Sequence, residues 1–430
     1  MKIGLQTWGS EGDINPFIAL ASGLVQAGHT VKLYITEVSE RDYTAIAEQF
    51  GFQIVNVPNP LLPSVDMMAQ MGEAFKAIRD PSEQLKIINK FFFYPAESVM
   101  FQAAQELCAS SDLVVRHIFC YPTQLAAELA NIPVATLYPV HNVMPNRFQA
   151  PFGAVNLGAW AIPLWWRLAR FLINRVFLKQ INQLRNTQGQ KKITDVLTEA
   201  WSNESLNLIA VSKAVCPPKL IWPKHFNVCG FLNPAQLYKS NNLSKELIEF
   251  LNHPQAPLYF TFGSMLVPDK GSWQKVYETW LASVKSLGCR AIFQLPIPDL
   301  YPLPSEPNIL IVRRAPHHLI FPYCSAIIHH GGAGTTQSSL LAGRPSVVVA
   351  HIADQPFWGS ELKRLGVSAG WIRKDEMKSN LLAQLIARTL KNSSYLANAN
   401  RISKLMKNEN GINTAINELL NFSAQFRSTD

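Results

Sequence analysis

Short apolar runs of strand length alternate with amphipathic stretches along most of the chain. Residues 2–7 and 31–36 predict buried strands, and between them residues 16–27 place their large apolar side chains on one helical face. Asn15 before this helix and Gly28 after it are typical start and stop signals. A strand, a helix and a second strand in this order form a right-handed βαβ unit, so the pattern predicts an α/β fold with a doubly wound parallel sheet.

The same alternation continues to the end of the chain. A length of 430 residues indicates two or three domains, and 48% hydrophobic residues with 16% charged residues suffice for full-sized cores. Further strands are expected at residues 112–115, 134–137, 257–264, 291–295, 309–313, 326–328 and 346–350, and helices at 381–390 and 412–420.

The stretch 325–345 combines a strand, a glycine turn and a helix start. Residues 326–328 lead to His329 and His330, and the glycine-rich residues 331–334 open a helix. Free N–H groups and the positive dipole end of a helix bind anions, and glycine lets a phosphate approach the backbone. The turn therefore predicts a phosphate site, while glycines that serve only tight packing remain the alternative.

A polar pair follows the next strand. Residues 346–350 read as a buried strand that ends close to Asp354 and Gln355. Ligands of open α/β sheets bind outside the carboxyl ends of strands, so we expect this pair beside the phosphate site. A carboxylate and an amide can hydrogen-bond vicinal sugar hydroxyls, whereas the alternative is that Asp354 only caps the helix that Pro356 begins.

The loop after the first strand, at residues 8–15, does not contain the GxGxxG fingerprint of dinucleotide sites. Its two carboxylates, Glu11 and Asp13, would repel a pyrophosphate. Placed at the carboxyl end of a strand, Asp13 has the chemistry of a general base for an attacking hydroxyl. The alternative is a loop carboxylate favoured by the nearby helix N-terminus.

Three motifs in the C-terminal half together resemble a known family. HHGGAGTT at residues 329–336, GRP at 343–345 and DQPFWG at 354–359 are similar to the nucleotide-sugar site of GT-B glycosyltransferases. The closest branch holds sterol 3-beta-glucosyltransferases and bacterial enzymes that glycosylate natural products. The resemblance implies two Rossmann-like domains that face a central cleft, with a UDP-sugar such as UDP-glucose bound by the second domain and the acceptor by the first.

The resemblance also implies site residues. Asp354, Gln355 and Trp358 would bind the donor sugar. The acceptor pocket is expected at Trp8, Gly12, His141, Asn142 and Trp165. His141 and Asn142 are included because they follow the carboxyl end of the strand at 134–137, and the alternative for His141 is an incidental loop histidine. His318 and Leu319 depart from the Asp-Trp that is common in sterol enzymes. The nucleotide and its phosphates would contact Gly263, Ser264, Arg314, His317, His329, His330, Gly332, Ala333, Gly334, Thr335 and Thr336.

The segment GSEGDINP, at residues 9–16, resembles the family's GSRGD segment, whose Asp is the proposed base. Asp13 is the matching position, and Glu11 replaces the usual Arg. Two neighbouring acids could raise the pKa of Asp13 or share its role. By the same resemblance the first domain spans residues 1–230, a linker 231–256 and the second domain 257–410, with a helix at 411–430 that returns to the first domain.

Residues 129–194 contain no Asp or Glu and carry eight Lys or Arg, against a net charge of +9 for the chain. Residues 164–185 predict an amphipathic helix with Trp165, Leu168 and Leu172 on one side and Arg167 and Arg170 opposite. A basic helix of this kind is typical of contact with an anionic membrane surface, which residues 147–192 would then make. The other open interpretation is that the apolar face belongs to the core or the acceptor pocket. Nucleic acid is not expected, since aromatic residues do not interleave a basic groove.

The remaining sequence features narrow the class of protein. Six cysteines without close pairs indicate reduced thiols, and the N-terminus lacks the apolar region of a signal peptide, so a cytoplasmic protein is expected, peripheral on the membrane if it binds one. No metal or cofactor is expected, since the chain has no Asp-x-Asp pair. The expected activity is inverting, metal-independent transfer of a hexose to a lipophilic acceptor. A GT-B epimerase or hydrolase and a non-catalytic nucleotide-sugar or lipid binder are the alternatives.

Overall fold

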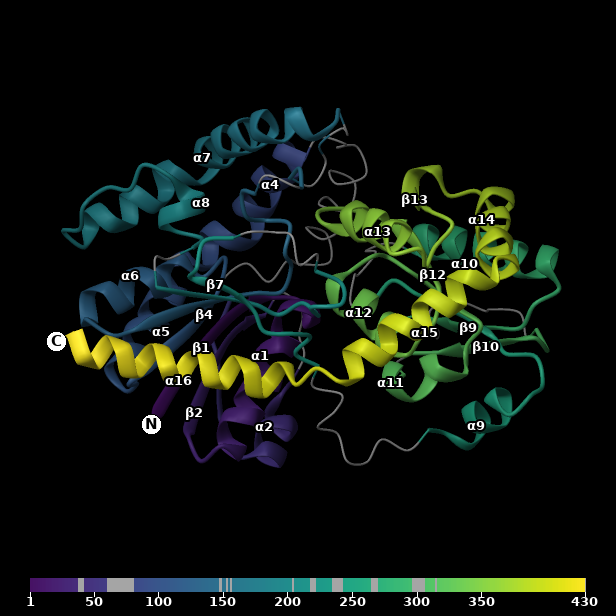
Figure 1. Ribbon diagram of the computed structural model, residues 1–430, viewed down its shortest axis with the longest axis horizontal. Helices are drawn as coiled ribbons and strands as arrows, with labels where there is room; N and C mark the ends of the chain where they lie inside the picture. Colours follow the sequence, from purple (N-terminus) through teal and green to yellow (C-terminus); the bar gives the residue numbers. More distant parts are fainter. Residues whose placement is uncertain are drawn as a thin grey trace. The chain divides into compact units, whose positions relative to one another are not determined.

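The structure is a computed structural model that describes residues 1–37, 42–59, 81–146, 149–151, 154, 157–202, 205–216, 222–233, 243–263, 270–295, 306–313 and 315–429. The described residues form two compact units. Unit 1 contains those up to residue 233 and those from Glu409 onward, and unit 2 contains those from residue 243 to Asn408. Each unit is built on a parallel sheet covered by helices (Figure 1), so the predicted doubly wound α/β architecture is confirmed for each.

The described strands of unit 1 form one seven-stranded sheet in the order β3-β2-β1-β4-β5-β6-β7, with every neighbouring pair parallel. The central strands are almost wholly buried, which explains their uninterrupted apolar sequence. The strand bounds are β1 Lys2–Gly9, β2 Thr30–Glu37, β3 Gln53–Asn56, β4 Leu113–His117, β5 Val134–Tyr138, β6 Leu206–Ile209 and β7 Phe226–Val228.

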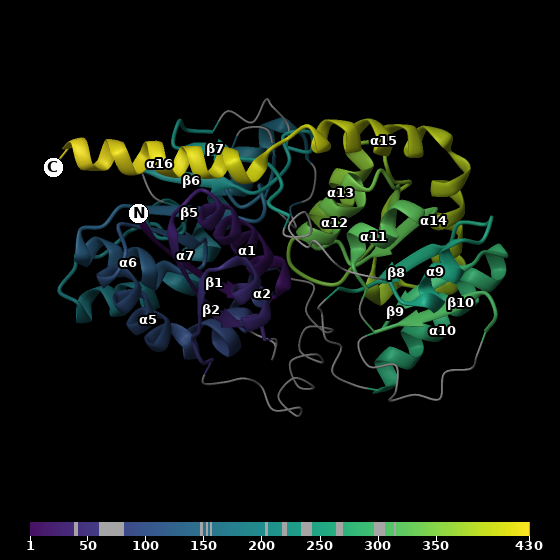
Figure 2. The same ribbon diagram turned by 90° about the horizontal axis from the view of Figure 1, so that it is seen from below.

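Helices cover this sheet, and the last of them comes from the C-terminal end of the described chain. In α16, Ala415, Ile416 and Leu419 are buried in the same apolar core as α1. Figure 2 shows α16 alongside β6 and β7, where Asn227 donates a 2.9 Å hydrogen bond to Glu418. The helix bounds are α1 Glu11–Gln26, α2 Thr44–Phe50, α4 Pro81–Ile88, α5 Glu97–Ala109, α6 Tyr121–Ala130, α7 Ile162–Thr187, α8 Val196–Glu199 and α16 Gly411–Thr429.

The described strands of unit 2 form a six-stranded parallel sheet in the order β10-β9-β8-β11-β12-β13. Its two faces bury separate apolar clusters, because Phe260 and Tyr259 of β8 point to opposite sides. The strands are β8 Leu258–Thr261, β9 Ala291–Gln294, β10 Ile309–Val312, β11 Ala326–His329, β12 Ser346–Ala350 and β13 Trp371–Arg373. The helices are α9 Lys245–Leu251, α10 Lys270–Leu287, α11 His317–Ile320, α12 Ala333–Leu341, α13 Gln355–Arg364, α14 Ser379–Lys391 and α15 Ser393–Lys407.

Each sheet reverses its winding direction at one pair of neighbouring strands. In unit 1 this pair is β1 and β4, and in unit 2 it is β8 and β11. Loops leave such a pair in opposite directions at the carboxyl ends and open a crevice there, which is where doubly wound folds bind ligands. Asp13 comes shortly after the end of β1, and His329 is the last residue of β11. Both predicted residues therefore lie beside these strand pairs.

The first helix starts earlier than the sequence signals predicted. We expected the helix to begin at Pro16 after an Asn15 cap, but α1 begins at Glu11 with Ser10 as its N-cap. Pro16 is the sixth residue of α1, so the helix lacks one i→i−4 hydrogen bond at this position. Asp13 therefore belongs to the first turn of a helix and not to a loop.

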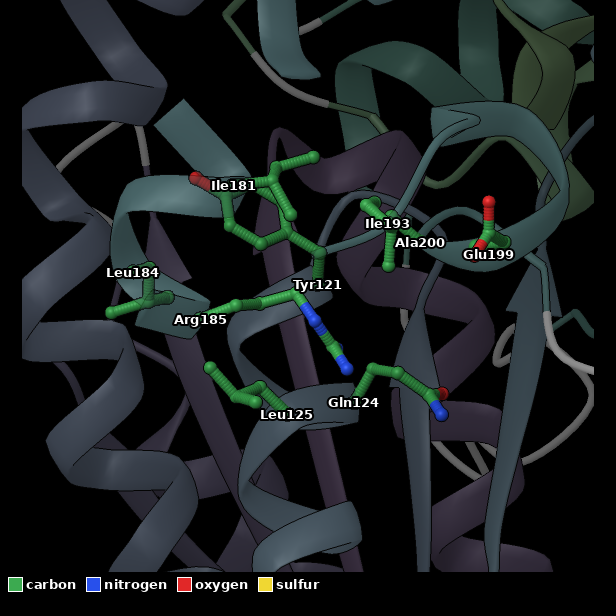
Figure 3. Close-up of a pocket in the computed structure, with 9 residues that line it drawn as sticks. All are labelled: Tyr121, Gln124, Leu125, Ile181, Leu184, Arg185, Ile193, Glu199 and Ala200. Atoms are coloured by element: carbon green, nitrogen blue, oxygen red, sulfur yellow. The ribbon is translucent and has the colours of Figure 1, made fainter. Parts of the chain in front are cut away.

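The long helix α7 confirms the predicted helix, but the predicted apolar face is wrong in part. Its buried residues include Ile162, Trp166, Ile173 and Phe177, whereas Leu168 is 45% exposed. On its inner side α7 packs on α6 around a cavity of about 10 Å³, which holds at most about one water molecule. Figure 3 shows side chains of both helices lining this cavity, which is too small for an acceptor.

Candidate active site

Asp13 lies just beyond the carboxyl end of β1, in the first turn of α1. Its Oδ2 accepts hydrogen bonds from the backbone N–H of Ser10 at 2.9 Å and from the Ser10 hydroxyl at 3.2 Å. This oxygen therefore caps α1 from within its first turn, whereas the sequence had suggested a loop carboxylate beside a later helix start. The side chain keeps 29% of its surface exposed, so the carboxylate is also open to a ligand.

The other oxygen of Asp13 faces a histidine that sequence reasoning missed. His117 is the last residue of β4, is fully buried, and has its Nε2 3.5 Å from Asp13 Oδ1. The backbone N–H of Phe119 donates to His117 Nδ1 at 3.3 Å, so a neutral His117 carries its proton on Nε2, toward Asp13. At 3.5 Å the contact is too long for a good hydrogen bond, and such contacts shorten in reactant complexes. His117 is thus placed to orient the carboxylate.

Gly9 makes room for this carboxylate. The residue has φ +128°, and a Cβ there would lie 2.4 Å from Asp13 Oδ2. At Gly12, the residue directly before Asp13, a Cβ would meet only Ser10 Oγ at 3.7 Å. The two glycines therefore form a matched pair for testing whether the position of Asp13 matters.

We expect Gly9→Ala to lower kcat for sugar transfer by roughly tenfold to a hundredfold, since a displacement of about 1 Å can cost about 10² in rate. Gly12→Ala should keep the wild-type rate within about threefold, because its Cβ finds open space and Ala favours the helix. Steady-state kinetics of the two variants, with circular dichroism to verify folding, test this. Equal rates for the two would show that the Asp13 geometry is not rate-determining.

Aromatic side chains lie around the Asp13–His117 pair. The ring of Phe119 is 5.4 Å from that of His117 and 5.0 Å from that of Trp201, and Trp8 is 4.7 Å from Phe93. Phe119 is only partly buried. Stacked and edge-on rings of this kind make a rigid apolar wall that suits a ring-bearing or hydrocarbon acceptor.

A buried polar group supports this wall from behind. The hydroxyl of Tyr121, whose ring stacks on Phe93, donates to Glu97, and Gln180 of α7 donates to the same Glu97 oxygen at 2.8 Å. Burial raises the pKa of Glu97 to about 7. No local sequence pattern indicates this group, because its members come from three separate helices.

The other residues predicted for the acceptor occupy different places. His141 and Asn142 are fully buried in the loop after β5, and the Asn142 amide makes no hydrogen bond within the described residues. An unsatisfied buried amide costs about 1–3 kcal/mol, which a ligand group can recover. Trp8 is buried, Gly12 is exposed, and Trp165 is half-buried on α7.

In unit 2, the turn after β11 presents unpaired backbone donors. The N-cap of α12 is Gly332, and the N–H groups of Ala333, Gly334 and Thr335 have no acceptor among the residues that the structure describes. These three residues are partly exposed, whereas Thr336 is buried and its hydroxyl donates to Gly332 O at 2.9 Å. The arrangement has the donors and the helix dipole of an anion site.

His329 lies at the end of β11, fully buried. Its Nδ1 accepts the Gly331 N–H at 3.0 Å, so the neutral ring carries its proton on Nε2, and this nitrogen has no partner in the described part of the chain. Burial, followed by the nearby His330 and His317, holds the pKa of His329 well below its usual range. The neutral ring can therefore donate one further hydrogen bond, from Nε2.

Three further histidines surround this turn. Burial lowers the pKa of His330 and of His317 to about 4, and His317 stacks on Phe321 while bonding Gln294 at 3.1 Å. Burial also holds the pKa of His351 well below its usual range. All of them are uncharged at neutral pH, so they serve here as packing and hydrogen-bonding groups.

These lowered pKa values predict that acid destabilises unit 2. In the unfolded chain a histidine binds a proton near pH 6.5, whereas the folded His330 binds one only near pH 4. The free energy of unfolding of unit 2 is therefore highest above pH 6.5 and falls as the pH drops toward 4. Each such histidine contributes at most about 1.4 kcal/mol per pH unit in this window. Urea unfolding above and below pH 6.5 measures how the free energy of unfolding changes with pH. His330→Gln should reduce this pH dependence, and an unchanged dependence would contradict the assignment.

The glycines of the turn have distinct structural reasons. A Cβ at Gly331, where φ is +91°, would lie 2.8 Å from Val348, and one at Gly332 would lie 2.4 Å from His330. At Gly263, after β8, a Cβ would lie 2.6 Å from His330. A Cβ at Gly334 would meet nothing within 4 Å, so this glycine faces the open side on which an anion would approach. Ser264 and Arg314, also predicted for the phosphates, lie outside the described residues.

The loop between β12 and α13 carries the predicted sugar-binding residues. Gln355 is buried, and its Oε1 accepts the N–H groups of His351 at 2.7 Å and Ile352 at 3.1 Å. Asp354 is the N-cap of α13 and accepts the indole N–H of Trp358 at 2.8 Å. Trp358 is fully buried, which favours a role in orienting Asp354 over direct contact with a sugar.

Comparison with known proteins agrees with this architecture. Residues 3–135 match the glycosyltransferase family 28 N-terminal domain, and residues 281–419 match the erythromycin biosynthesis protein CIII-like C-terminal domain. The chain belongs to the GT-B glycosyltransferases. This membership supports a transferase activity, and homologous glycosyltransferases bind a nucleotide-sugar donor and a small-molecule acceptor.

Relatives of this glycosyltransferase differ in length. An uncharacterized glycosyltransferase of Mycobacterium leprae is 27% identical over 96% of this chain and 95% of its own length. A sterol 3-beta-glucosyltransferase of Arabidopsis thaliana is 25% identical over 97% of this chain and 67% of its own. A UDP-sugar-dependent glycosyltransferase of Dictyostelium discoideum is 26% identical over 97% of this chain, which spans only 26% of that relative.

Solved structures show the same fold. The calicheamicin glycosyltransferase CalG4 superposes with a TM-score of 0.69 at 16% identity, covering 98% of both chains. Glycosyltransferase VinC, solved with dTDP, gives a TM-score of 0.64 at 16% identity over 99% of this chain and 100% of that one. No helix in the described ranges is long and apolar enough to cross a membrane, and no cluster of three metal-ligating side chains occurs there.

Proposed function

We propose that this glycosyltransferase moves a hexose, with glucose as the first candidate, from a UDP-sugar to a hydroxyl of a lipophilic acceptor, with inversion at the anomeric carbon. The observation that carries the proposal is the Asp13 carboxylate, which uses Oδ2 to cap α1 and leaves Oδ1 beside His117. A carboxylate fixed at one oxygen and open at the other has the geometry of a general base.

In the proposed reaction, Asp13 takes the proton from the acceptor hydroxyl as the hydroxyl oxygen attacks the anomeric carbon. The bond from that carbon to the diphosphate oxygen breaks in the same step, so the sugar is transferred once, with inversion. The Nε2 of His117 faces Asp13 Oδ1 at 3.5 Å and orients the carboxylate before proton transfer. Afterwards the protonated Asp13 returns its proton to solvent.

Unit 2 receives the charge of the leaving group in this proposal. The free N–H groups of Ala333, Gly334 and Thr335 and the Nε2 proton of His329 are donors that need no rearrangement to meet a diphosphate. Preorganised donors of this kind stabilise a developing anion most effectively in a buried site. With these donors the proposed reaction requires no metal or cofactor beyond the UDP-sugar. Asp354, oriented by Trp358, would bind sugar hydroxyls.

The choice of donor and acceptor classes rests on two supports. The Dictyostelium relative is named as UDP-sugar-dependent and the Arabidopsis relative as a sterol glucosyltransferase. The aromatic wall of Trp8, Phe93 and Phe119 suits an apolar acceptor such as a sterol, another lipid or an apolar natural product.

The test is a UDP-release assay with UDP-glucose, run with and without a panel of sterols, other lipids and phenolic compounds, with products identified by mass spectrometry. We expect UDP release that depends on an apolar acceptor and a product heavier by one hexose. UDP release without any acceptor would instead indicate a hydrolase or epimerase. Binding of UDP-glucose without turnover across the panel would contradict the proposal.

A further inference from the structure

An exposed apolar stripe runs along α7 and the 3₁₀ helix Ala159–Ala161 before it, and includes Leu157 just upstream. The structure leaves Leu157, Trp160, Leu164, Leu168 and Phe171 exposed by 51%, 70%, 50%, 45% and 60%. In the described chain these are five of the thirteen large hydrophobic residues that are exposed, and Trp160 is the most exposed of all. Scattered exposed apolar residues are normal, but a concentration in one short stretch marks an interaction surface.

These residues share one side of the helix. Positions 160, 164, 168 and 171 are spaced by three or four, and such residues line up along one helical face. The opposite face buries Trp166, Ile173, Phe177 and Ile181 against the rest of unit 1. The helix thus has two apolar faces, and the outward one is not used by the fold.

Cations accompany the outward face. Arg167 and Arg175 are exposed on the same side, at about 100° per residue, and Lys179 lies at its edge. No carboxylate of the described residues forms an ion pair with these three, whereas Arg170 pairs with Asp195 at 3.5 Å and Arg185 with Glu128 at 2.9 Å. The helix itself, Ile162–Thr187, contains no Asp or Glu.

We propose that the α7 outer face, defined as Leu157, Trp160, Leu164, Leu168 and Phe171 with Arg167 and Arg175, binds the surface of an anionic lipid bilayer. The helix would lie in the plane of the membrane interface. Its aromatic and aliphatic side chains would enter the boundary between headgroups and acyl chains, and its guanidinium groups would contact the lipid phosphates. A second copy of the chain is a poor occupant, because two such faces would bring unpaired cations together.

The proposal concerns binding and does not depend on the transfer reaction. The test is co-sedimentation of the full chain with phosphatidylcholine vesicles that contain or lack phosphatidylglycerol. We expect binding to the anionic vesicles, weakened by salt, and at least about tenfold less binding to neutral ones, since each basic residue near an anionic surface adds about 1 kcal/mol.

Two variants address the two components of the surface. Leu164→Glu with Phe171→Glu should lower the partition coefficient for anionic vesicles by at least about tenfold, since it removes buried apolar area. Arg167→Glu with Arg175→Glu should lower it by about tenfold or more. All four side chains are exposed, so the thermal unfolding temperature should not change.

Matched controls come from α15, which also exposes leucines and cations. Leu396 and Leu405 are 39% and 48% exposed, and Arg401 and Lys404 are exposed on the same helix. Leu396→Glu with Leu405→Glu, and Arg401→Glu with Lys404→Glu, should leave vesicle binding unchanged. Equal losses in the α7 and α15 variants, or equal binding to neutral and anionic vesicles, would overturn the proposal. So would self-association that the α7 variants abolish without any vesicle binding by the wild-type chain.

Discussion

Asp13→Asn is expected to lower kcat by about 10²–10⁴, the usual contribution of a general base. Asn has the same shape, and its carbonyl oxygen can still accept the Ser10 N–H that Asp13 Oδ2 accepts at 2.9 Å. The helix cap is therefore retained while the basic oxygen beside His117 is lost. Donor affinity should not change, because the proposed diphosphate site belongs to unit 2. Steady-state kinetics and isothermal titration with UDP test the two statements.

Glu11→Gln is the matched control for this prediction. Glu11 is the first residue of α1 and lies two residues before Asp13. If Asp13 alone is the base, Glu11→Gln keeps kcat within about threefold, because Glu11 then takes no part in proton transfer and Gln has the same size. A large loss for Glu11→Gln with little loss for Asp13→Asn would move the base to Glu11, and near-wild-type activity in both variants would remove general base catalysis from this segment.

His329→Asn is expected to lower kcat by about 10²–10³, the usual cost of removing one hydrogen-bond donor to a developing anion. The Oδ1 of Asn can replace Nδ1, which accepts the Gly331 N–H at 3.0 Å, but Asn has no group at the position of Nε2. The turn should therefore keep its shape while the diphosphate loses one donor. Kinetics with UDP-glucose measure the loss, and circular dichroism verifies the fold.

His329→Gln provides the comparison, because its amide nitrogen can reach the position of Nε2 while the acceptor at Nδ1 is lost. We expect Gln to keep more activity than Asn and to unfold at a lower temperature, since it leaves the buried Gly331 N–H unpaired at a cost of about 1–3 kcal/mol. Equal activity in the two variants would mean that the Nε2 proton of His329 does not contact the leaving group.

The strand, glycine turn and helix start at residues 326–341 could be predicted because their signals are local in sequence. The apolar run of β11, the glycines and the start of α12 are contiguous, and the steric contacts of Gly331 and Gly332 explain why glycine is present. The partner of Asp13 could not be predicted in this way. His117 reaches Asp13 only because β4 lies beside β1, and that adjacency depends on the strand order of the whole sheet.

Two other differences have local physical causes. The start of α1 was placed too late, because Pro16 after Asn15 imitates a helix start, whereas Ser10 and Asp13 cap the helix one turn and a half earlier. The predicted buried face of α7 was wrong in part, because the helix carries apolar residues on two sides. Periodicity identifies Trp166 and Leu168 as apolar positions but cannot decide which of them the fold buries.

The position of α16 has a consequence for biosynthesis. Unit 1 buries Ala415, Ile416 and Leu419 against α1, so its core is incomplete until these residues have left the ribosome. Unit 2, whose described residues end at Asn408, has its whole sequence available earlier. Domains fold as units during synthesis, usually from the N-terminal end. In this chain the order is expected to be reversed, with the nascent N-terminal sheet exposing apolar surface to chaperones while unit 2 is already folding.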